Sequence, residues 1–375
     1  MKIAITGSRG FLGWHTAVRL RAEQGVDPLR LGREDFATTE SLLMALGDAD
    51  TLIHAAGVNR AETAEEVESG NVDIASTLAD AIVRSGRPVH LVYANSIQSE
   101  LDNPYGRGKS RAGEILEAAA RKVAGTFVDV CLPNLFGEHG RPHYNSFVAT
   151  FCDELAKGGD PTITNDKRVP LLHVQRASAG LVAAAYRRED HRPELEVEGR
   201  LVSDVLGMLR EFHEKYAQGQ VPALGDAFTI DLFNTYRSYV FPQYFPFRVK
   251  VNADKRGQLF ETVRQHGGTG QTFVSTTGPG ETRGDHFHLS KVERFFVLQG
   301  TAEIALRRVY DDEIIRFRVT GGDRAYVDMP TMWVHNITNI GDDELITLFW
   351  TDQLLNPAAP DTYWESVDLD EKARS

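Results

Sequence analysis

The sequence predicts a two-part chain, in which a doubly wound, mostly parallel α/β sheet precedes a small all-β barrel. Strand-like and helix-like segments alternate from residue 2 to about residue 132, which is typical of right-handed βαβ units. A glycine-rich turn joins the first expected strand to the first helix. After about residue 245, short strands follow one another without helices between them, as in antiparallel sandwiches and small barrels.

The first half of the chain supports the α/β assignment element by element. Apolar runs that favour buried strands occupy residues 2–6, 27–31, 50–57, 89–94 and 126–132. Helical patterns occupy residues 11–24, 39–46, 72–85 and 105–121, with Thr38 or Thr39 as the cap of the second helix. From about residue 141 to 245 the pattern is less regular, with helices expected near 145–157, 177–187 and 201–217. We expect this stretch to form a lobe that covers the substrate.

The second half begins at a segment dense in Tyr, Phe and Pro, residues 236–247, which indicates a domain junction. Short alternating runs follow at 272–276, 294–298, 303–309, 314–319, 325–328 and 345–350. We therefore predict two domains, residues 1–245 and residues 246–375.

Composition excludes several functional classes. The 375 residues are 42% hydrophobic and 25% charged, as in ordinary globular enzymes. A net charge of −12 disfavours nonspecific binding to nucleic acid or to anionic membranes. No apolar run approaches the ~20 residues of a membrane span. Met1 leads almost directly into a strand, and Cys131 and Cys152 are the only cysteines, so neither a signal peptide nor a disulfide scaffold is expected. A cytoplasmic location fits these features.

The glycine-rich turn predicts a dinucleotide site. Gly7, Gly10 and Gly13 follow the first strand in the spacing G-x-x-G-x-x-G. Glycine permits the tight turn and a close approach of backbone to a pyrophosphate, which the helix N-terminus then attracts. Plain packing of a strand against a helix is the alternative interpretation of this triplet.

The choice of dinucleotide is usually made at the end of the second strand, where an acidic residue binds the ribose 2′-hydroxyl of NAD. This chain has Leu31, Gly32 and Arg33 there, so Arg33 and Arg9 are candidates to face a 2′-phosphate. Glu34 and Asp35 follow closely and leave the register open. We predict NADPH as the cofactor.

Tyr105 and Lys109 are four residues apart, on one face of an expected helix. A free tyrosine has a pKa near ~10, so a nearby cation is needed to bring it into working range at neutral pH. Ser96 follows the preceding strand, where its hydroxyl can polarise a carbonyl group. We expect these three residues to carry hydride-transfer chemistry, although a surface Tyr–Lys pair is the commoner origin of this spacing.

The barrel region contains a candidate metal site. His286 and His288 are separated by one residue of an expected strand and therefore point to the same face. Glu293 and His335 can complete the set of ligands. Such ligands suit Zn, Fe, Mn or Ni, and zinc is the ion we expect. A histidine-lined pocket without metal is the alternative.

The N-terminal motifs resemble those of the extended short-chain dehydrogenases/reductases, which have a Rossmann-like fold and act on nucleotide sugars. The segments 54–57 (His-Ala-Ala-Gly) and 133–137 (Pro-Asn-Leu-Phe-Gly) also match that family. Two features depart from it: the short gap between Ser96 and Tyr105, and residues 173–176 (His-Val-Gln-Arg) in place of the usual Tyr-Val-x-Asp.

This resemblance implies roles for individual residues. Ser96, Tyr105 and Lys109 would form the catalytic triad, with Lys109 also binding the nicotinamide ribose. The cofactor-binding residues would be Gly7, Arg9, Gly10, Phe11, Leu12, Gly13, Arg33, His54, Ala55, Ala56 and Lys109. The substrate-binding residues would be Asn59, Asn134, Asn145 and Arg168.

The C-terminal motifs resemble the two-part signature of cupins, except that Met332 stands where glycine is common. Residues 254–261 and 283–286 also resemble the deoxy-sugar 3,5-epimerases of that class, in which the histidine of Arg-Gly-x-His abstracts a proton. His286 cannot easily be both a free base and a metal ligand. Lys291 or a metal-bound water is the alternative base.

Over essentially its full length the chain resembles the CapF/WbjC family of bifunctional capsular-polysaccharide enzymes, in which an extended reductase precedes one cupin. The resemblance implies a homodimer that acts on a UDP-2-acetamido-2,6-dideoxy-L-hexos-4-ulose. The cupin would invert carbon 3, and the reductase would then reduce the 4-keto group with NADPH, giving the L-talose sugar of UDP-N-acetyl-L-fucosamine synthesis.

Two alternatives stay open at this point. The reductase half can be an epimerase or dehydratase that uses tightly bound NAD as a hydride store. The cupin can be a non-catalytic module for dimerisation or ligand sensing.

Overall fold

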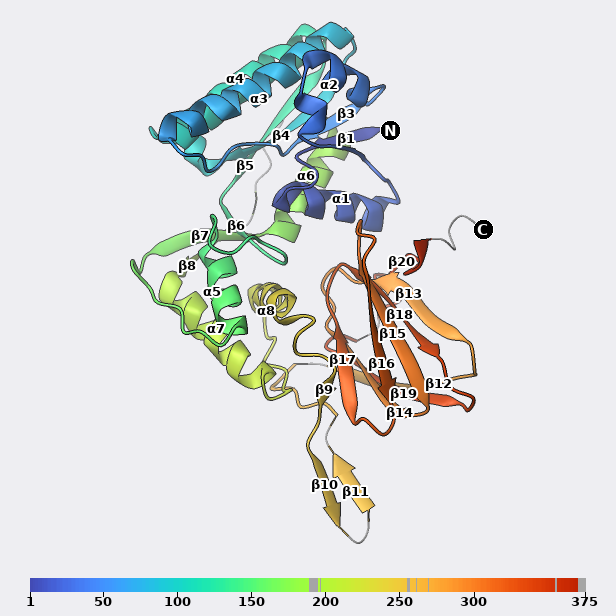
Figure 1. Ribbon diagram of the computed structural model, residues 1–375. Helices are drawn as coiled ribbons and strands as arrows, with labels where there is room; N and C mark the ends of the chain where they lie inside the picture. The colour runs from blue at the N-terminus through green and yellow to red at the C-terminus, as the bar shows by residue number, and fades with distance from the viewer. Residues whose placement is uncertain are drawn as a thin grey trace. The chain divides into compact units, whose positions relative to one another are not determined.

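The computed structural model describes residues 1–188, 195, 197–254, 257–260, 262–268, 270–354 and 356–369. The chain packs as two compact units (Figure 1). The first contains residues 1–150 and 163–202, and the second contains residues 151–162 and 203–375. These units differ from the domains expected on either side of residue 245, and that functional boundary stays a prediction.

A five-stranded parallel sheet forms the centre of the first unit, with the strand order β2-β1-β3-β4-β5. The order reverses beside β1, as in doubly wound nucleotide-binding folds, which confirms the predicted parallel α/β class. The strands are β1 (Ile3–Thr6), β2 (Leu29–Leu31), β3 (Thr51–His54), β4 (His90–Ser96) and β5 (Thr126–Leu132).

Helices cover both faces of this sheet (Figure 1). One face carries α2, α3 and α4, and the other carries α1 and α6. The bounds are α1 (Phe11–Gln24), α2 (Thr39–Leu46), α3 (Ala64–Ser85), α4 (Pro104–Lys122) and α6 (Val174–Arg187), with short 3₁₀ turns η1 (Glu34–Phe36) and η2 (Ile97–Glu100).

Helix α3 begins eight residues earlier than expected. Thr63 and Glu66 form a capping box, in which each side chain binds the backbone amide of the other residue. The first turns carry several glutamates and little apolar periodicity, so the hydrophobic pattern did not show this start.

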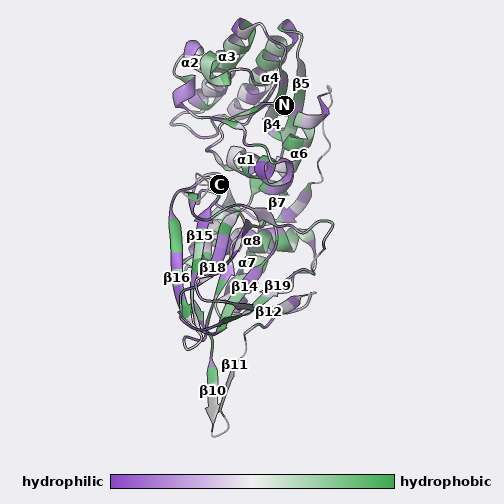
Figure 2. Cartoon of the chain, turned by 90° about the vertical axis from the view of Figure 1, so that its right-hand side faces the viewer, coloured by the Kyte–Doolittle hydropathy of each residue, from purple (hydrophilic) through white to green (hydrophobic). Residues whose placement is uncertain are grey.

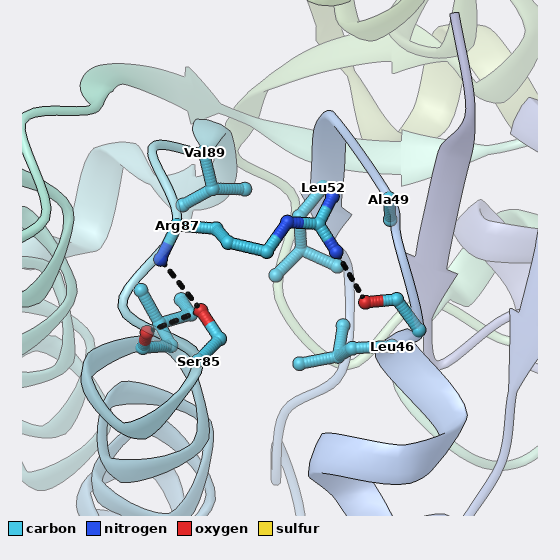
Figure 3. Close-up of a pocket in the computed structure, with 8 residues that line it drawn as sticks. Leu46, Ala49, Leu52, Ser85, Arg87 and Val89 are labelled. Carbon is cyan, nitrogen blue, oxygen red and sulfur yellow. Dashed lines mark hydrogen bonds between the residues drawn. The ribbon is translucent and has the colours of Figure 1, made fainter.

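A small pocket lies at the edge of the first unit's core, beside the end of α3 (Figure 3). Arg87 spans it and donates a hydrogen bond of 2.7 Å to the carbonyl oxygen of Gly47. The pocket has a volume of about 20 Å³, enough for roughly one water molecule. None of the predicted site residues lines it, so this pocket is a feature of packing and not a substrate site.

A second, smaller sheet in the first unit contains β6 (Asn134–Phe136), β7 (Arg168–His173) and β8 (Glu198–Leu201). β6 and β7 are parallel, whereas β7 and β8 are antiparallel. This sheet carries two of the predicted substrate residues, Asn134 and Arg168.

The second unit contains most of α5 (Phe147–Ala156) together with α7 (Val202–Tyr216) and α8 (Ala227–Val240). Helix α8 was not predicted from the sequence. Asp226 caps it by accepting a hydrogen bond from the Thr229 amide. Its many aromatic and β-branched residues have modest helix propensity, and burial of residues spaced four apart, from Phe228 to Val240, stabilises the helix instead.

The strands of the second unit form two five-stranded sheets, ordered β12-β19-β14-β17-β9 and β16-β15-β18-β13-β20, and a separate hairpin of β10 and β11. Pairing is antiparallel throughout these sheets, as predicted. Closure into a cupin barrel stays a prediction. The bounds are β9 (Phe247–Arg248), β10 (Val251–Asp254), β11 (Gly257–Phe260), β12 (Gln271–Thr277), β13 (Thr282–Phe287), β14 (Glu293–Gln299), β15 (Thr301–Arg308), β16 (Ile314–Thr320), β17 (Ala325–Met329), β18 (Trp333–Asn339), β19 (Leu345–Thr351) and β20 (Tyr363–Trp364).

The hydrophobic core of the second unit lies on the inner faces of these sheets. Hydrophobic and hydrophilic residues alternate along outer strands such as β16 (Figure 2). Apolar side chains from both sheets pack together with Phe241 from the end of α8. Part of the epimerase-like motif at 254–261, namely Lys255, Arg256 and Glu261, lies outside the described residues.

None of the described helices combines the length and apolar character that crossing a bilayer requires.

Candidate active sites

The glycine-rich turn forms a tightly packed cradle. Gly7 has a φ angle of 65°, and a Cβ at this position would lie 2.8 Å from the backbone of Ala56. A Cβ at Gly13 would lie 2.3 Å from the carbonyl oxygen of Gly7. Both positions therefore require glycine. Gly10 is the N-cap of α1 and has no side chain to satisfy the first amides of the helix, which remain available to a phosphate.

The predicted cofactor residues lie around this cradle. Phe11 and Leu12 form the first turn of α1, and Ala55 and Ala56 follow β3 directly behind Gly7. His54 lies deeper. Its ring Nδ1 is 2.7 Å from the Thr6 hydroxyl, and the ring stacks on Tyr93. Burial, assisted by the charge of Lys109, lowers the pKa of His54 to about 3 and keeps the ring neutral.

The end of β2 carries mixed charges. Arg33 is exposed there, and its role at a 2′-phosphate stays a prediction. Arg9 forms an ion pair with Glu34, with 2.8 Å between Nη2 and Oε1. The carboxylate of Asp35 accepts a hydrogen bond of 2.7 Å from the amide of Gly32. An acidic group thus caps the strand end, and Arg9 is partly neutralised by its neighbour.

Ser96 and Tyr105 are brought together despite the short segment between them. Asn103 caps α4 by accepting a hydrogen bond of 2.8 Å from the Gly106 amide, and Pro104 occupies the first turn. The turn η2 packs so closely on α4 that a Cβ at Gly106 would lie 2.2 Å from the Gln98 carbonyl oxygen. This packing shortens the path from β4 to α4. Burial raises the pKa of Tyr105, and a side-chain hydrogen bond with Ser96 opposes that rise.

Lys109 follows Tyr105 by about one turn of α4, and its side chain is buried. Its ammonium donates a hydrogen bond of 2.7 Å to the carbonyl oxygen of Ala94 and lies 4.1 Å from the centroid of the Tyr93 ring. Burial lowers the pKa of Lys109 to about 7, while Asp129 and Cys131 favour its charged form. The triad members therefore share one region at the carboxyl end of β4, with the lysine directed at Ala94.

Asp129 is an acidic neighbour that the sequence analysis missed. It accepts a hydrogen bond of 3.2 Å from Asn95, and both side chains lie on the sheet face covered by α4. The detectable signal was a carboxylate within an otherwise apolar strand.

The predicted substrate residues form two groups. Asn59 and Asn145 are joined, because the side-chain amide of Asn145 donates to the Asn59 carbonyl oxygen at 3.3 Å. Tyr144 adds a hydrogen bond of 2.7 Å to the Asn59 side chain. Asn134 and Arg168 lie on neighbouring strands, where they donate to the carbonyl oxygens of Pro170 and Gly199.

The second site contains His286, His288, Glu293 and His335, whose candidate ligand atoms all lie within 4.8 Å of one another. They come from β13, the turn after it, the start of β14 and β18. Oε2 of Glu293 lies 3.0 Å from Nε2 of His288 and 3.3 Å from Nε2 of His335. The spacing of these residues in the sequence thus predicted a real cluster.

The electrostatics of this cluster suit a cation. Burial, together with repulsion from its neighbours His335 and His288, lowers the pKa of His286 to about 3. Burial also lowers the pKa of His335. Although burial alone would raise the pKa of Glu293, its contacts with His288 and His335 bring it well below the usual range. Neutral imidazoles around a carboxylate are the forms that bind a metal ion.

Backbone carbonyls orient two of the imidazoles. Nδ1 of His288 lies 2.5 Å from the Asp361 carbonyl oxygen, and Nδ1 of His335 lies 3.0 Å from the Trp333 carbonyl oxygen. Each contact places the proton on Nδ1 and leaves the lone pair of Nε2 facing the cluster. Asp361 is a further residue that the sequence analysis missed.

Lys291, a candidate base, and Met332, which stands where cupins commonly have glycine, both lie near the cluster. The Lys291 ammonium donates to the Pro360 carbonyl oxygen at 3.0 Å and to the Thr362 hydroxyl at 3.3 Å. Met332 has a φ angle of 63°, which explains why glycine is common at this position of the cupin motif. The methionine side chain is nevertheless buried.

Comparison with known proteins gives two matched regions. Residues 3–195 match the NAD dependent epimerase/dehydratase family, and residues 252–363 match the polysaccharide biosynthesis C-terminal domain. Over 371 residues the chain is 30% identical to a UDP-2-acetamido-2,6-beta-L-arabino-hexul-4-ose reductase of Pseudomonas aeruginosa, covering 98% of this chain and 99% of that protein.

The chain is also similar to solved structures. The capsular polysaccharide assembling protein CapF of Staphylococcus aureus superposes with a TM-score of 0.62 at 31% identity, covering 98% of this chain and 100% of that chain. The UDP-glucose 4-epimerase of Thermus thermophilus, in complex with NAD, superposes with a TM-score of 0.54 at 17% identity, covering 64% of this chain and 100% of that chain. The second likeness concerns the fold alone.

Proposed function

Because this chain belongs to the NAD dependent epimerase/dehydratase family and matches nucleotide-sugar enzymes over its full length, we propose that it is a bifunctional nucleotide-sugar epimerase and reductase. The substrate is a UDP-2-acetamido-2,6-dideoxy-L-hexos-4-ulose. Carbon 3 is inverted first, and the 4-keto group is then reduced with NADPH to give the UDP-L-talose derivative of UDP-N-acetyl-L-fucosamine, in capsule or O-antigen synthesis. We also propose that the protein is a homodimer and is located in the cytoplasm.

The observation that carries this proposal is the presence of two chemically different sites in the two units. The first unit contains a Ser96–Tyr105 pair beside a buried lysine, on a fold with a phosphate cradle. The second unit contains three histidines and a glutamate directed at one point. A single reaction needs only one of these sites, whereas epimerisation followed by reduction needs both.

The order of the two steps follows from the chemistry of the sugar. The 4-keto group acidifies the neighbouring carbon-3 proton, so a base can remove it and leave an enolate. Protonation from the opposite face inverts the centre. Reduction at carbon 4 removes the ketone and with it the acidity, so epimerisation must come first.

In the reductase step, NADPH would supply a hydride to carbon 4 when it is bound. Tyr105 donates its phenolic proton to the oxygen of the former ketone, and Ser96 orients that oxygen through its hydroxyl. The Lys109 cation stabilises the resulting phenolate when it is charged. The cradle of Gly7, Gly10 and Gly13 binds the pyrophosphate.

A divalent ion, with zinc as the expected one, fits the residues of the second site. The ligand atoms converge, and burial lowers the pKa of His286 and that of His335, which favours the neutral forms that bind a metal ion. His286, His288, Glu293 and His335 would hold it, and a bound ion supplies Lewis acidity toward the sugar carbonyl. His286 and Lys291 stay the candidate bases. His286 could act as the base only while it does not hold the ion. With the ion bound, Lys291 is the candidate base, although its ammonium donates hydrogen bonds to Pro360 and Thr362.

The deciding experiment incubates the full chain with the 4-keto UDP-sugar in D₂O, with and without NADPH, and follows the products by NMR. We expect deuterium at carbon 3 without cofactor, and the talose configuration with stoichiometric NADPH oxidation when cofactor is present. Turnover of a 4-hydroxy UDP-sugar without added cofactor would favour an epimerase with bound NAD. Reduction without any carbon-3 exchange would make the second site non-catalytic.

A further inference from the structure

Trp364 is an exposed aromatic residue on the edge of the second unit. Its side chain is 78% exposed, whereas Trp14 and Trp350 are 7% and 4% exposed. Burial of so large an apolar surface normally stabilises a fold, and an exposed indole leaves that surface available for contact with a ligand.

The strand that carries Trp364 is held firmly on its N-terminal side. The carboxylate of Asp361 accepts backbone hydrogen bonds of 2.9, 2.9 and 3.0 Å from Leu289, Ser290 and Lys291. Three charge-assisted hydrogen bonds to one carboxylate fix this segment against the turn that follows His288.

The C-terminal side is held equally well. Glu365 forms a buried ion pair with Arg307, with 2.8 Å between the atoms, and its amide donates to the Asp285 carbonyl oxygen at 2.9 Å. Two residues further on, the Val367 amide donates to the Asp285 carboxylate at 3.0 Å. Trp364 is therefore exposed and at the same time rigidly mounted.

The ring of Trp364 lies directly beside the histidine and glutamate cluster. Strand β20 pairs with β13, with Trp364 opposite His286, and the two ring centroids are 5.4 Å apart at an interplanar angle of 75°. A ligand that approaches His286 from this side meets the indole.

From this geometry we propose that Trp364 is the platform on which the sugar ring of the substrate rests while its carbon 3 reaches the cluster. The C–H groups on one face of a pyranose form a flat, apolar surface that packs on an aromatic ring. A rigid mount keeps the entropy cost of this contact low. The proposal rests on the proposed epimerase function, because that reaction places the sugar, and not the uracil, beside His286.

A first test uses fluorescence of the full chain without NADPH. Of the four tryptophans, Trp364 is the one most accessible to iodide, since Trp14 and Trp350 are buried and Trp333 is half-buried. Saturating UDP-N-acetylglucosamine should reduce iodide quenching in the wild type but not in Trp364→Leu, and UDP alone should protect less. Equal protection by UDP and by the sugar nucleotide would assign the ring to the base and overturn the proposal.

A second test measures carbon-3 deuterium exchange on the 4-keto UDP-sugar. Trp364→Ala should raise KM about 5- to 10-fold with little change in kcat, as expected for a lost aromatic stacking contact. Trp364→Phe keeps a ring and should stay within about twofold of the wild type. Leu354→Ala, which truncates another exposed apolar side chain of this unit, should leave KM unchanged.

The outcomes separate this proposal from the one on which it rests. A wild type that exchanges no carbon-3 proton refutes the epimerase function. A wild type that exchanges it, together with an unchanged KM in Trp364→Ala, refutes only the platform. Metal content and solution mass are measured for each variant. A change of mass in Trp364→Ala would assign the ring to an interface between copies of this chain, and would also overturn the proposal.

Discussion

The hydroxyl of Tyr216 on α7 donates a hydrogen bond to the carboxylate of Asp328 on β17, with 2.5 Å between the oxygen atoms. The same carboxylate accepts two hydrogen bonds from Arg294, of 2.7 and 3.1 Å. Arg237 on α8 donates to the Met329 carbonyl oxygen at 2.8 Å. These residues are buried, so α7 and α8 belong to the interior of the second unit.

We predict that Asp328→Asn destabilises the protein by about 3–5 kcal/mol, because it leaves the guanidinium of Arg294 buried without its counter-ion. Urea unfolding of the second unit measures the loss. Glu211→Gln breaks a surface ion pair with Lys215 in the same unit and serves as the control, with an expected change of less than about 1 kcal/mol. Equal losses in the two variants would contradict the central role of Asp328.

Much of this fold could be predicted from the sequence, because its determinants are local. Helix α1 was predicted at its exact bounds, since its glycines and apolar runs determine it without tertiary help. Helix α7 was also predicted, near 201–217, whereas α8 and the buried contacts of these helices with the sheets were not. The pairing of Tyr216 with Asp328 joins residues 112 positions apart, and no local pattern encodes such a contact. The boundary near residue 245 was inferred from composition, whereas the two compact units are defined by contacts between distant segments, and that boundary stays a prediction.

In the candidate sites too, features with a local sequence pattern were predicted, and features that depend on contacts between distant residues were not. The histidine and glutamate cluster was found because its spacing in the sequence reflects the alternation of side chains along strands. Asp361 and Trp364 were missed, because they reach that cluster through pairing of the distant strand β20 with β13. The direction of Lys109 toward Ala94 likewise depends on packing against β4.

Tyr105→Phe is expected to reduce NADPH-dependent reduction of the 4-keto UDP-sugar by about 10²–10⁴-fold, the usual effect of a lost general acid. Carbon-3 exchange by the second site should persist in this variant. The control is Tyr186→Phe, which removes a hydroxyl from a more exposed tyrosine of the same unit. Near-native reductase turnover in Tyr105→Phe would remove Tyr105 from the mechanism.

Cofactor preference depends on the charges at the end of β2. We expect the wild type to prefer NADPH, and Arg33→Asp to lower the ratio of kcat/KM for NADPH over NADH by about tenfold, through loss of one charge-assisted contact. Glu34→Gln should raise the same ratio, because it frees Arg9 from its ion pair. Steady-state kinetics with both cofactors measure these ratios. A ratio that stays unchanged or rises in Arg33→Asp, together with one that falls in Glu34→Gln, would show that the 2′-phosphate is bound elsewhere.

Metal binding should appear as about one divalent ion per chain in elemental analysis of protein purified without chelator. His335→Ala should lower both the metal content and the Tm of the second unit, because an ion that binds only the folded state stabilises it. His266→Ala, which alters an exposed histidine of the same unit, should change neither quantity. Full native stability of the metal-free protein would exclude a structural role for the ion.

The low pKa of the buried Lys109 makes the stability of the protein depend on pH. Burial lowers its pKa from 10.5 to about 7 in the folded protein, so between these values the unfolded chain binds a proton that the folded chain has lost. The free energy of unfolding therefore increases with pH across this window. Lys109→Met removes the contribution, and the variant should be more stable than the wild type near pH 6, by an amount on the order of a few kcal/mol that shrinks toward pH 10.

Urea unfolding at several pH values tests this dependence, because titrations shared by both proteins cancel in the difference between them. Lys122→Met, which replaces an exposed lysine near the end of the same helix, should follow the pH dependence of the wild type. A difference between Lys109→Met and the wild type that stays constant with pH would show that the buried ammonium keeps its proton throughout. In that case Asp129 and Cys131, which favour the charged form, would outweigh burial.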